Sequence, residues 1–430
     1  MKIKNLNIYI AMLIIMMMSS LHPMQLWAQS DSLSHYLAIA AENNPGLKAD
    51  YLAYQAKLQQ TAQVGTLPEL QLDMGFYVKP MAIIDGNQVA DFTLMQMFPW
   101  FGTKKTAQAA INHSANAAFE TFKLARNKLF LEVYTSWFRL SNLKQQSLNI
   151  EQHTTYLQQL ERLSKNKYAT NNTQSTGISD ILRIQLELME LDNQAETVQL
   201  AIQTEEALFN SLLNRPTHLA IQLPDSILQI PYMLDLCDAE KKIMQNNPEL
   251  QMIQEETAAY KAKALADKKA GLPMWGLGLQ YSIIEKRDAT YIPTTPMNGM
   301  DMVMPMLSVS IPIYRNKYKA QQQESVYWQE AGEAKYSDTY NQLRAELIAV
   351  KHALEDADRK IKLIAKQSEL AQTTWQLILN EFASGKSDLS DVIQVQRQLL
   401  DYRLKSAEAI AAFNIEVAKV QKLVSEIYEN

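Results

Sequence analysis

The chain contains two copies of one pattern of residues, and this duplication constrains the fold more than any other feature. The markers are Asn43-Asn44-Pro45, Leu67-Pro68, Phe98-Pro99 and Ser179-Asp180 in the first copy, and Asn246-Asn247-Pro248, Leu272-Pro273, Ile311-Pro312 and Ser390-Asp391 in the second. The first two prolines are 23 residues apart in one copy and 25 in the other. Because chance similarity seldom keeps its register over such a length, the sequence predicts one structural unit built twice.

The first 28 residues have the features of a cleaved secretory signal. Lys2 and Lys4 precede an apolar run over residues 8–18, and a Leu-Trp-Ala cleavage site follows at residues 26–28. The run is too short to span a bilayer as a helix. The single cysteine, Cys237, is far from this site, so no lipid-anchor cysteine is expected there and no disulfide can form within one chain. The sequence therefore predicts an exported protein, and its net charge of −5 argues against a nucleic-acid partner.

Proline and glycine are absent from long parts of each copy, which predicts unusually long helices. Neither occurs from residue 103 to residue 176, and only Gly332 occurs from 313 to 384. We predict long helices over residues 102–167 and 313–383, each followed by a returning helix over 178–214 and 388–430. A helix of about 65 residues is roughly 100 Å long, and such a helix needs a coiled-coil partner.

The apolar residues of these windows indicate how the helices pack. In the second copy a heptad seam is formed by Leu343, Leu347, Val350, Leu354, Ala357, Ile361 and Ile364. In the first copy, Phe130, Tyr134, Trp137 and Phe138 add apolar surface beyond a single stripe. Helices with more than one apolar stripe have more than one neighbour, so we expect a ring or layer of helices and not a two-stranded rod.

A β-hairpin is predicted ahead of each long helix, over about residues 69–99 and 273–312. Apolar and polar residues alternate in both segments, for example from Leu70 to Val78 and from Trp275 to Ile283. Each run has about 9–11 residues, the length that a tilted strand needs to cross a bilayer. The alternative is a pair of surface hairpins on a soluble helical protein.

The hairpins give four strands in one chain, and this number has a consequence in a membrane. Four strands leave two open edges, whose unpaired backbone groups lipid cannot satisfy. Several chains would therefore close one barrel together. The predicted organisation is a signal peptide (1–28), a first repeat (29–215), an equatorial linker region (216–244) and a second repeat (245–430).

With these features in place, the chain resembles the TolC-type outer membrane efflux protein family. The resemblance is carried by the helix–hairpin–helix duplication, the Asn-Asn-Pro start of each copy, residues 96–102 (Gln-Met-Phe-Pro-Trp-Phe-Gly) and the Asp-containing turns near the helix tips. Residues 96–102 are similar to members that serve heavy-metal and related resistance-nodulation-division (RND) pumps.

The resemblance implies a homotrimer with a shared 12-strand barrel in the outer membrane and a helical α-barrel across the periplasm. Residues 216–244 and the C-terminal end would belt the helices. The implied function is a passive exit duct, supplied by a periplasmic adaptor and an inner-membrane pump of RND type. It implies neither an enzyme nor a cofactor.

The resemblance also implies that the tips of the paired helices form the periplasmic gate and dock the adaptor. The tip residues are Tyr168, Gly177, Ser179, Asp180 and Arg183 in the first copy, and Phe382, Gly385, Ser390, Asp391 and Gln394 in the second. From the residues alone, both glycines permit a chain reversal. Both serines are expected to cap the returning helix, with the aspartates favourable in its first turn. Other members carry a second acid where Arg183 and Gln394 stand, so the resemblance does not extend to an acidic ring.

Methionines cluster in or beside the hairpins. They are Met74, Met81, Met95, Met97, Met297, Met300, Met302, Met304 and Met306. Soft thioethers select Cu(I), so methionines facing a lumen would suit a copper or silver pump, whereas packing or lipid contact is the more usual reason for methionine. The six histidines are scattered without a metal-ligand partner at helical spacing, and no phosphate loop or nucleophile motif occurs.

Other functions compete with the efflux duct. An outer-membrane channel for type I protein secretion would use the same architecture. A soluble exported coiled-coil structural protein would use the helices but not the barrel. A periplasmic adaptor would need Gly-rich lipoyl-like halves and would lack the second copy, and an enzyme would need a cluster of polar residues that the sequence does not contain.

Overall fold

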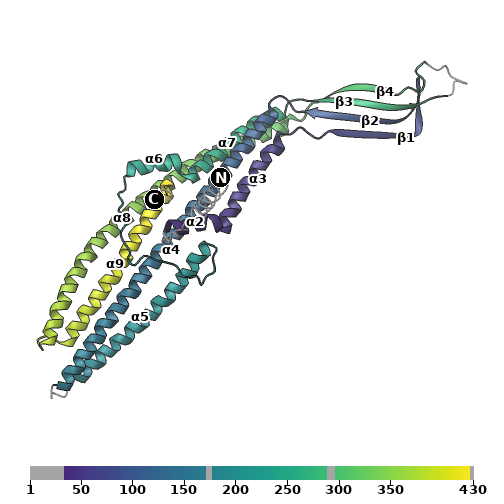
Figure 1. The fold of residues 1–430 in the computed structure, drawn as a ribbon. Coiled ribbons are helices and arrows are strands. Elements are labelled where there is room, and N and C mark those ends of the chain that lie inside the picture. The colour runs from purple at the N-terminus through teal and green to yellow at the C-terminus, as the bar shows by residue number, and fades with distance from the viewer. Residues whose placement is uncertain (1–32, 171–176, 288–295, 427–430) are drawn as a thin grey trace, which may run out of the picture.

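The computed structural model describes residues 33–170, 177–287 and 296–426. Over these residues the molecule is elongated, with long helices along most of its length and a small sheet at one end (Figure 1). This arrangement confirms the predicted fold class, which is mainly helical with four strands in each chain. The predicted signal peptide and the last residues of the predicted C-terminal helix lie outside the described residues.

Both halves of the chain contain the same series of elements. In the first half these are α2 (Leu33–Asn43), α3 (Pro45–Gly65), β1 (Gln71–Ile83), β2 (Gly86–Phe98), α4 (Thr103–Thr170) and α5 (Gly177–Leu212). In the second half they are α6 (Leu236–Asn246), α7 (Pro248–Ala270), β3 (Met274–Glu285), β4 (Met302–Ser310), α8 (Arg315–Ala383) and α9 (Leu389–Val424). Each hairpin is thus preceded by two helices where the sequence analysis predicted one. The break falls at Asn44 and Asn247, whose extended backbone reflects the restriction that a following proline imposes.

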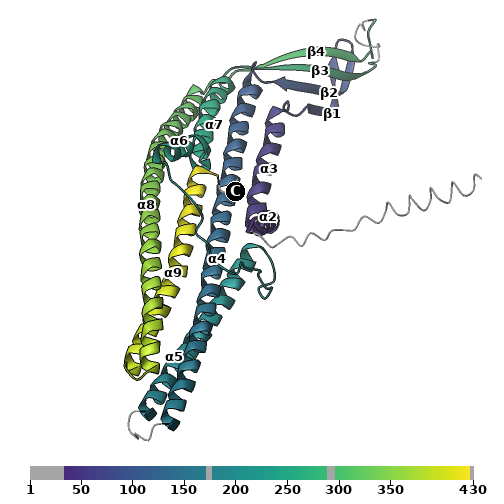
Figure 2. The same ribbon diagram turned by 60° about the vertical axis from the view of Figure 1, so that its left-hand side comes forward.

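The helices form a curved layer in which α4 and α8 are the long members (Figure 2). In the half near the sheet, the order across the layer is α3, α4, α7 and α8. In the half near the tips, the order is α5, α4, α9 and α8. Helices α3 and α5 therefore pack against successive parts of α4, and α7 and α9 pack against successive parts of α8. The layer agrees with the expectation that helices with several apolar stripes have several neighbours.

The predicted seam of α8 is part of the core. Its members from Leu343 to Ala357 and Ile364 are buried, and Ile361 is partly buried. In α4, Phe130 and Val133 are fully buried, and Trp137 packs against Tyr36 and Phe209 with ring centroids 5.4 and 6.0 Å away. The wider apolar surface of α4 is used because α2, α5 and α9 all pack against it.

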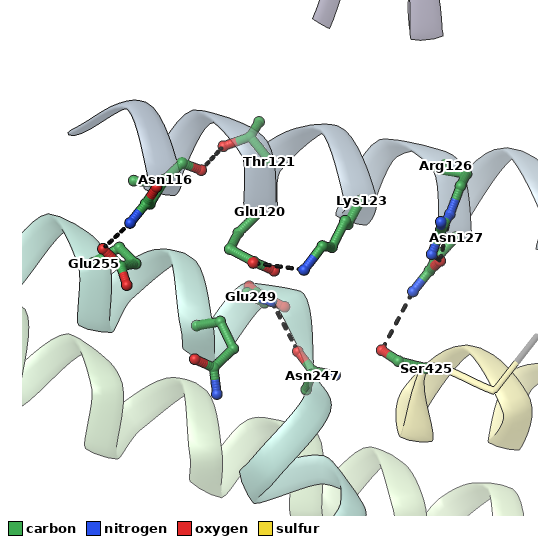
Figure 3. Close-up of polar contacts among 12 residues, drawn as sticks. Asn116, Glu120, Thr121, Lys123, Arg126, Asn127, Asn247, Glu249, Glu255 and Ser425 are labelled. Atoms are coloured by element: carbon green, nitrogen blue, oxygen red, sulfur yellow. Dashed lines mark hydrogen bonds and ion pairs between the residues drawn. The ribbon is translucent and has the colours of Figure 1, made fainter. Parts of the chain in front are cut away.

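Polar side chains add specific contacts between α4 and its neighbours α7 and α9 (Figure 3). Asn127, which is 1% exposed, donates to the hydroxyl of Ser425 at the end of α9 over 3.3 Å. Asn116 donates to Glu255 of α7 over 3.2 Å. Each bond forms only when its two groups lie opposite each other. The two bonds therefore fix the position of α4 along its axis relative to the second repeat.

The segment between the repeats, residues 213–235, contains no helix or strand. Two fully buried asparagines hold it against the helices. Asn210 of α5 donates to the Leu219 carbonyl over 2.8 Å. Asn414 of α9 donates to the Leu228 carbonyl over 2.8 Å and accepts from the Ile230 amide over 2.9 Å. The predicted linker region over 216–244 thus consists of this bound segment and most of α6.

The four strands form one antiparallel sheet in the order β1-β2-β3-β4. The strand register gives the sheet two different faces. The face that we call the apolar face carries Leu72, Met74, Phe76, Phe92, Leu94, Trp275, Leu277, Leu279, Tyr281, Val303, Pro305, Leu307 and Val309. The face that we call the polar face carries Gln71, Asp73, Gly75, Gln88, Asp91, Thr93, Met95, Met97, Met274, Gly276, Gly278, Gln280, Ser282, Ile284, Met302, Met304, Met306, Ser308 and Ser310.

Three aromatic rings gather where the sheet meets the helices. The ring of Trp275 lies 6.4 Å from that of Trp100 and 6.5 Å from that of Phe101, measured between centroids. Aromatic side chains of this kind are typical of the border between a lipid bilayer and water. Among the described residues, no helix combines the length and the apolar character needed to cross a membrane.

Candidate functional site

The tip of the second repeat is a tight turn between α8 and α9. Helix α8 ends at Ala383, and Gly385 adopts a φ of +78°, which is unfavourable for residues with a side chain. The amide of Lys386 then donates to the carbonyl of Glu381 over 2.9 Å. This bond is typical of a helix end closed by a left-handed glycine, so the predicted role of Gly385 in the reversal is confirmed.

The start of α9 differs from the prediction. The helix is preceded by Asp388 as its N-cap residue, and Ser390 lies inside the first turn. The prediction that Ser390 caps the helix was therefore wrong, because the turn is shorter than the capping pattern assumed. Asp391 does lie in the first turn, as predicted, and accepts a 3.3 Å hydrogen bond from Ser387.

At the tip of the first repeat, the structure describes the end of α4 and the start of α5. The connection between them, residues 171–176, lies outside the described residues. Gly177 is the first residue of α5, and Asp180 is in its first turn. A Cβ on Gly177 would lie 2.5 Å from Cδ2 of Tyr168, so the tyrosine ring packs over this glycine. The structure thus brings Tyr168 and Gly177 together. Ser179 is the third residue of α5 and not its N-cap, which corrects the second capping prediction.

Two polar links join the returning helices α5 and α9 close to the tips. Arg183 of α5 donates to the Ser390 hydroxyl of α9 over 2.7 Å. Farther from the tips, the Arg397 guanidinium of α9 binds Glu187 of α5 with two hydrogen bonds, and the bond from its Nε is 2.8 Å long. Two-pronged binding of this kind is the geometry that an arginine and a carboxylate favour. Arg183, which stands where the resemblance implies a second acid, therefore links the helix pair α4–α5 to the helix pair α8–α9.

The remaining predicted tip residues are divided between core and surface. Phe382 is 6% exposed and belongs to a core cluster with Trp375, Leu389 and Val392. Gln394 is exposed on α9. The tips are thus anchored by an apolar core, while most of their polar groups remain accessible.

A buried polar pair lies between α4 and α9, above the tips. His153 of α4 is 0% exposed and Gln396 of α9 is 1% exposed. Gln396 Nε2 donates to His153 Nδ1 over 3.1 Å, and Nε2 of the histidine has no hydrogen-bond partner. Burial, with a smaller effect of the charge on Arg403, lowers the pKa of His153 to about 4. The histidine is therefore neutral at the pH of most cellular compartments.

Sequence reasoning did not identify Glu187, Arg397, His153 or Gln396. The partners in each pair are more than 200 residues apart, for example 210 between Glu187 and Arg397. For His153 and Gln396 the signal that could have suggested the pair is a polar residue among the apolar positions of a helix, because a buried polar group needs a partner. The exposed Arg397 carries no such signal. Among the described residues, no group of three or more His, Cys, Asp or Glu residues could hold a metal ion.

Known proteins with related sequences and structures fit this arrangement. Residues 241–425 match the model of the outer membrane efflux protein family. No curated protein sequence matches the chain.

Solved structures share the fold over almost the whole chain. The outer-membrane channel OprN is 14% identical, with a TM-score of 0.71 over 93% of this chain and 92% of that one. The outer membrane protein VceC from Vibrio cholerae is 14% identical, with a TM-score of 0.71 over 91% and 95%. The open state of the MtrE outer membrane channel from Neisseria gonorrhoeae is 15% identical, with a TM-score of 0.69 over 92% and 89%. Residues 241–425 thus match the outer membrane efflux protein family, and the chain as a whole shares the fold of these outer-membrane channels.

Proposed function

We propose that three copies of this chain form an outer-membrane exit duct for efflux, supplied by a periplasmic adaptor and an inner-membrane pump. The family match supports an efflux role. The observation that carries the proposal is the four-stranded sheet, which has one apolar face and two strands, β1 and β4, that pair on one side only among the described residues.

The sheet edges require partners if the sheet lies in lipid. Each unpaired backbone group in a hydrocarbon environment costs several kcal/mol. The apolar face exposes large side chains such as Phe76, Leu277 and Leu307, which are 70%, 58% and 68% exposed. Pairing β1 of one copy with β4 of the next satisfies the edges and leaves this face toward lipid. With three copies, the closed barrel would have the 12 strands that the family resemblance implies.

The helices show the same need for neighbours. Along α5, Ile178, Leu182, Leu186 and Met189 are 50% to 67% exposed. Along α8, Leu363, Leu370 and Leu377 are 49% to 69% exposed and recur every seven residues. These residues lie on the two helices at opposite edges of the layer near the tips. Contact between α5 of one copy and α8 of the next would cover both stripes.

The tips would then surround the periplasmic entrance of the duct. The links Arg183–Ser390 and Glu187–Arg397 hold the helix pairs α4–α5 and α8–α9 of one chain side by side. We infer that this arrangement is the closed entrance and that the adaptor docks at the same tips. The pump would be of RND type, an inference that rests on residues 96–102 alone.

Disulfide crosslinking tests the closure directly. Leu72 of β1 and Leu307 of β4 are separated by two strands within a chain, roughly 14 Å at the usual strand spacing, so cysteines there cannot bridge within one chain. In a Cys237→Ser background, cysteine pairs between residue 72 and residues 303, 307 or 309 should give covalent dimers and trimers in outer-membrane fractions.

The matched control is the pair Leu94→Cys and Leu279→Cys, whose residues face each other across β2 and β3. This pair should bridge within the chain and give no ladder of oligomers. Recovery of the protein as a soluble periplasmic monomer, with no crosslink between chains, would overturn the proposal.

A further inference from the structure

The polar face of the sheet has an unusual composition. Its strand positions mostly carry aspartate, glutamine, serine, threonine, glycine and methionine. Among the positions given above, only one carries leucine, isoleucine, valine or an aromatic residue. This residue, Ile284, and Tyr77 lie farther along the same face, beside Gln88 and Asp91. The apolar face carries leucine, valine and aromatic residues and only one methionine, Met74. If the side chains had been selected for apolar character alone, leucine and valine would be expected on both faces. Around the methionines, the thioether group is the chemical property that distinguishes this face from the apolar one.

The methionines form a continuous patch across three strands. They are Met95 and Met97 on β2, Met274 on β3, and Met302, Met304 and Met306 on β4. Met95 pairs with Gly278, which in turn pairs with Met306, so two thioethers flank one glycine in a single cross-strand row. Met302 and Met304 are 46% and 44% exposed, so their side chains are accessible on the polar face of the sheet.

The glycines of β3 make room for two of the sulfur atoms. Sδ of Met97 and Sδ of Met95 lie 2.7 and 3.0 Å from the point that a Cβ of residue 276 would occupy. The same Met95 sulfur lies 3.0 Å from the corresponding point at Gly278. The two thioethers thus converge over the backbone of β3, where any other residue would displace them.

Acidic groups lie on the same face. Asp73 of β1 is directly opposite Thr93, and Asp91 of β2 is opposite Gly75 and Ser282. Oδ1 of Asp91 lies 2.6 Å from the point that a Cβ of Gly75 would occupy. The face therefore combines soft neutral ligands with negative charge, a combination that favours a soft cation over an anion or a neutral compound.

We propose that the polar face is a series of weak thioether sites for a soft monovalent cation, with Cu(I) as the reference ion. This inference rests on the proposed duct, in which the polar face lines the lumen, and it names one class of cargo. Thioethers bind Cu(I) and do not bind hard cations such as Mg²⁺ or Ca²⁺. Neutral ligands spread over several strands bind an ion weakly and at many points, which is the condition for its onward movement.

The test uses the full-length assembly, purified in detergent without oxygen and with a reductant. Cu(I) binding is measured by competition with a coloured Cu(I) chelator. The test variant combines Met95→Leu, Met97→Leu, Met304→Leu and Met306→Leu. The control variant carries the same number of changes off the polar face, Met74→Leu, Met189→Leu, Met233→Leu and Met244→Leu. Methionine-to-leucine exchange conserves volume and is well tolerated in packed regions.

We expect wild type and control to bind Cu(I) equally and the test variant to bind at least about tenfold more weakly. The proposal is overturned if wild type does not bind, if the test variant binds as well as wild type, or if both variants lose binding equally. If the fourfold variant does not assemble, the two pairs of changes, one on β2 and one on β4, are measured separately with the same criteria.

Failure of this inference can be distinguished from failure of the duct. Crosslinked trimers in the outer membrane and restored tolerance to a dye, both without Cu(I) binding, would leave the duct standing and remove the metal cargo. A soluble monomer would remove both. In cells, the test variant should restore dye tolerance fully but copper tolerance only in part.

Discussion

Asn247 donates a 3.0 Å hydrogen bond from its side-chain amide to the main-chain carbonyl of Leu423, 176 residues later. Asn44 makes the same bond, also of 3.0 Å, to the carbonyl of Leu212. Each asparagine also accepts from an amide at the start of the helix that follows it, Glu249 or Leu47. The second asparagine of each Asn-Asn-Pro marker thus begins one helix of its half and binds the end of the last helix of that half. The recurrence of this marker in the sequence has this physical cause.

The first prediction concerns these two asparagines. Asn247 is 4% exposed, so Asn247→Ala leaves the buried Leu423 carbonyl and the partly buried Glu249 amide without this partner. We expect a loss of about 2 kcal/mol in the free energy of unfolding. Asn44 is only partly buried, so Asn44→Ala should cost about 1 kcal/mol. The temperature at which the purified assembly dissociates measures both, and equal effects would contradict the role of burial.

The second prediction tests the assignment of the two sheet faces. Leu279 and Gln280 are neighbours in β3 and lie on opposite faces. An arginine on the lipid side of a membrane strand costs about 2–4 kcal/mol near the middle of the bilayer, whereas a lumen position tolerates it. Leu279→Arg should therefore reduce the heat-resistant oligomer strongly, and Gln280→Arg should leave it close to wild type. The opposite order would reverse the faces and would also remove the lumen position of the methionines.

The third prediction concerns the close approach of α7 and α8. A Cβ on Gly332 would lie 2.3 Å from Oγ1 of Thr257, closer than atoms of this kind can approach. Gly332→Ala should therefore destabilise the assembly by about 1–3 kcal/mol through overpacking, although alanine is the better helix former. Thr257→Ala removes the clashing oxygen, so the double variant should recover most of the lost stability. Thermal dissociation of the three variants measures this coupling, and no rescue would show that the clash is not the cause.

The features that the sequence made predictable are the periodic ones. The seam from Leu343 to Ile364, the two hairpins and the long helices depend on local spacing, and spacing of 3.5 or 2 residues can be read directly from a sequence. That Met302, Met304 and Met306 share one face with methionines of β2 and β3 is shown by the strand register. Which face of the sheet is apolar became clear only from the composition of all four paired strands.

The features that could not be predicted depend on long-range contacts or on single-residue shifts. The bond between Arg397 and Glu187 joins two helices that have no local signal for each other. The N-cap position of α9 is Asp388, whose side chain makes no capping hydrogen bond, and not Ser390; this shift of two residues is the usual uncertainty of a helix boundary. Arg183 was noted as a departure from the expected acid, but its bond to Ser390 depends on how the two hairpins pack.

The fourth prediction concerns acid stability. His153 has a pKa of about 4 in the folded chain, against the ordinary histidine value of 6.5. Between these values the unfolded chain binds a proton that the folded chain does not, so stability is present above about pH 6.5 and is lost as the pH falls toward 4. The loss amounts to roughly 3 kcal/mol. His153→Gln should flatten this part of the curve of dissociation temperature against pH. The exposed His352 provides the control, and a similar flattening in His352→Gln would contradict the assignment to His153.

The last prediction concerns the bond that links α5 and α9 near the helix tips. Arg397→Ala removes the two-pronged bond to Glu187. The guanidinium is largely exposed, so the cost in stability should stay below about 1 kcal/mol. If the link helps to hold the entrance closed, its loss should instead raise the conductance of single channels in planar bilayers several-fold and sensitise cells to a large antibiotic that normally stays outside. Lys405→Ala, which breaks an ion pair with Asp401 within α9 alone, is the matched control and should conduct like wild type. Equal conductance of Arg397→Ala and wild type would show that this bond only supports the helix packing.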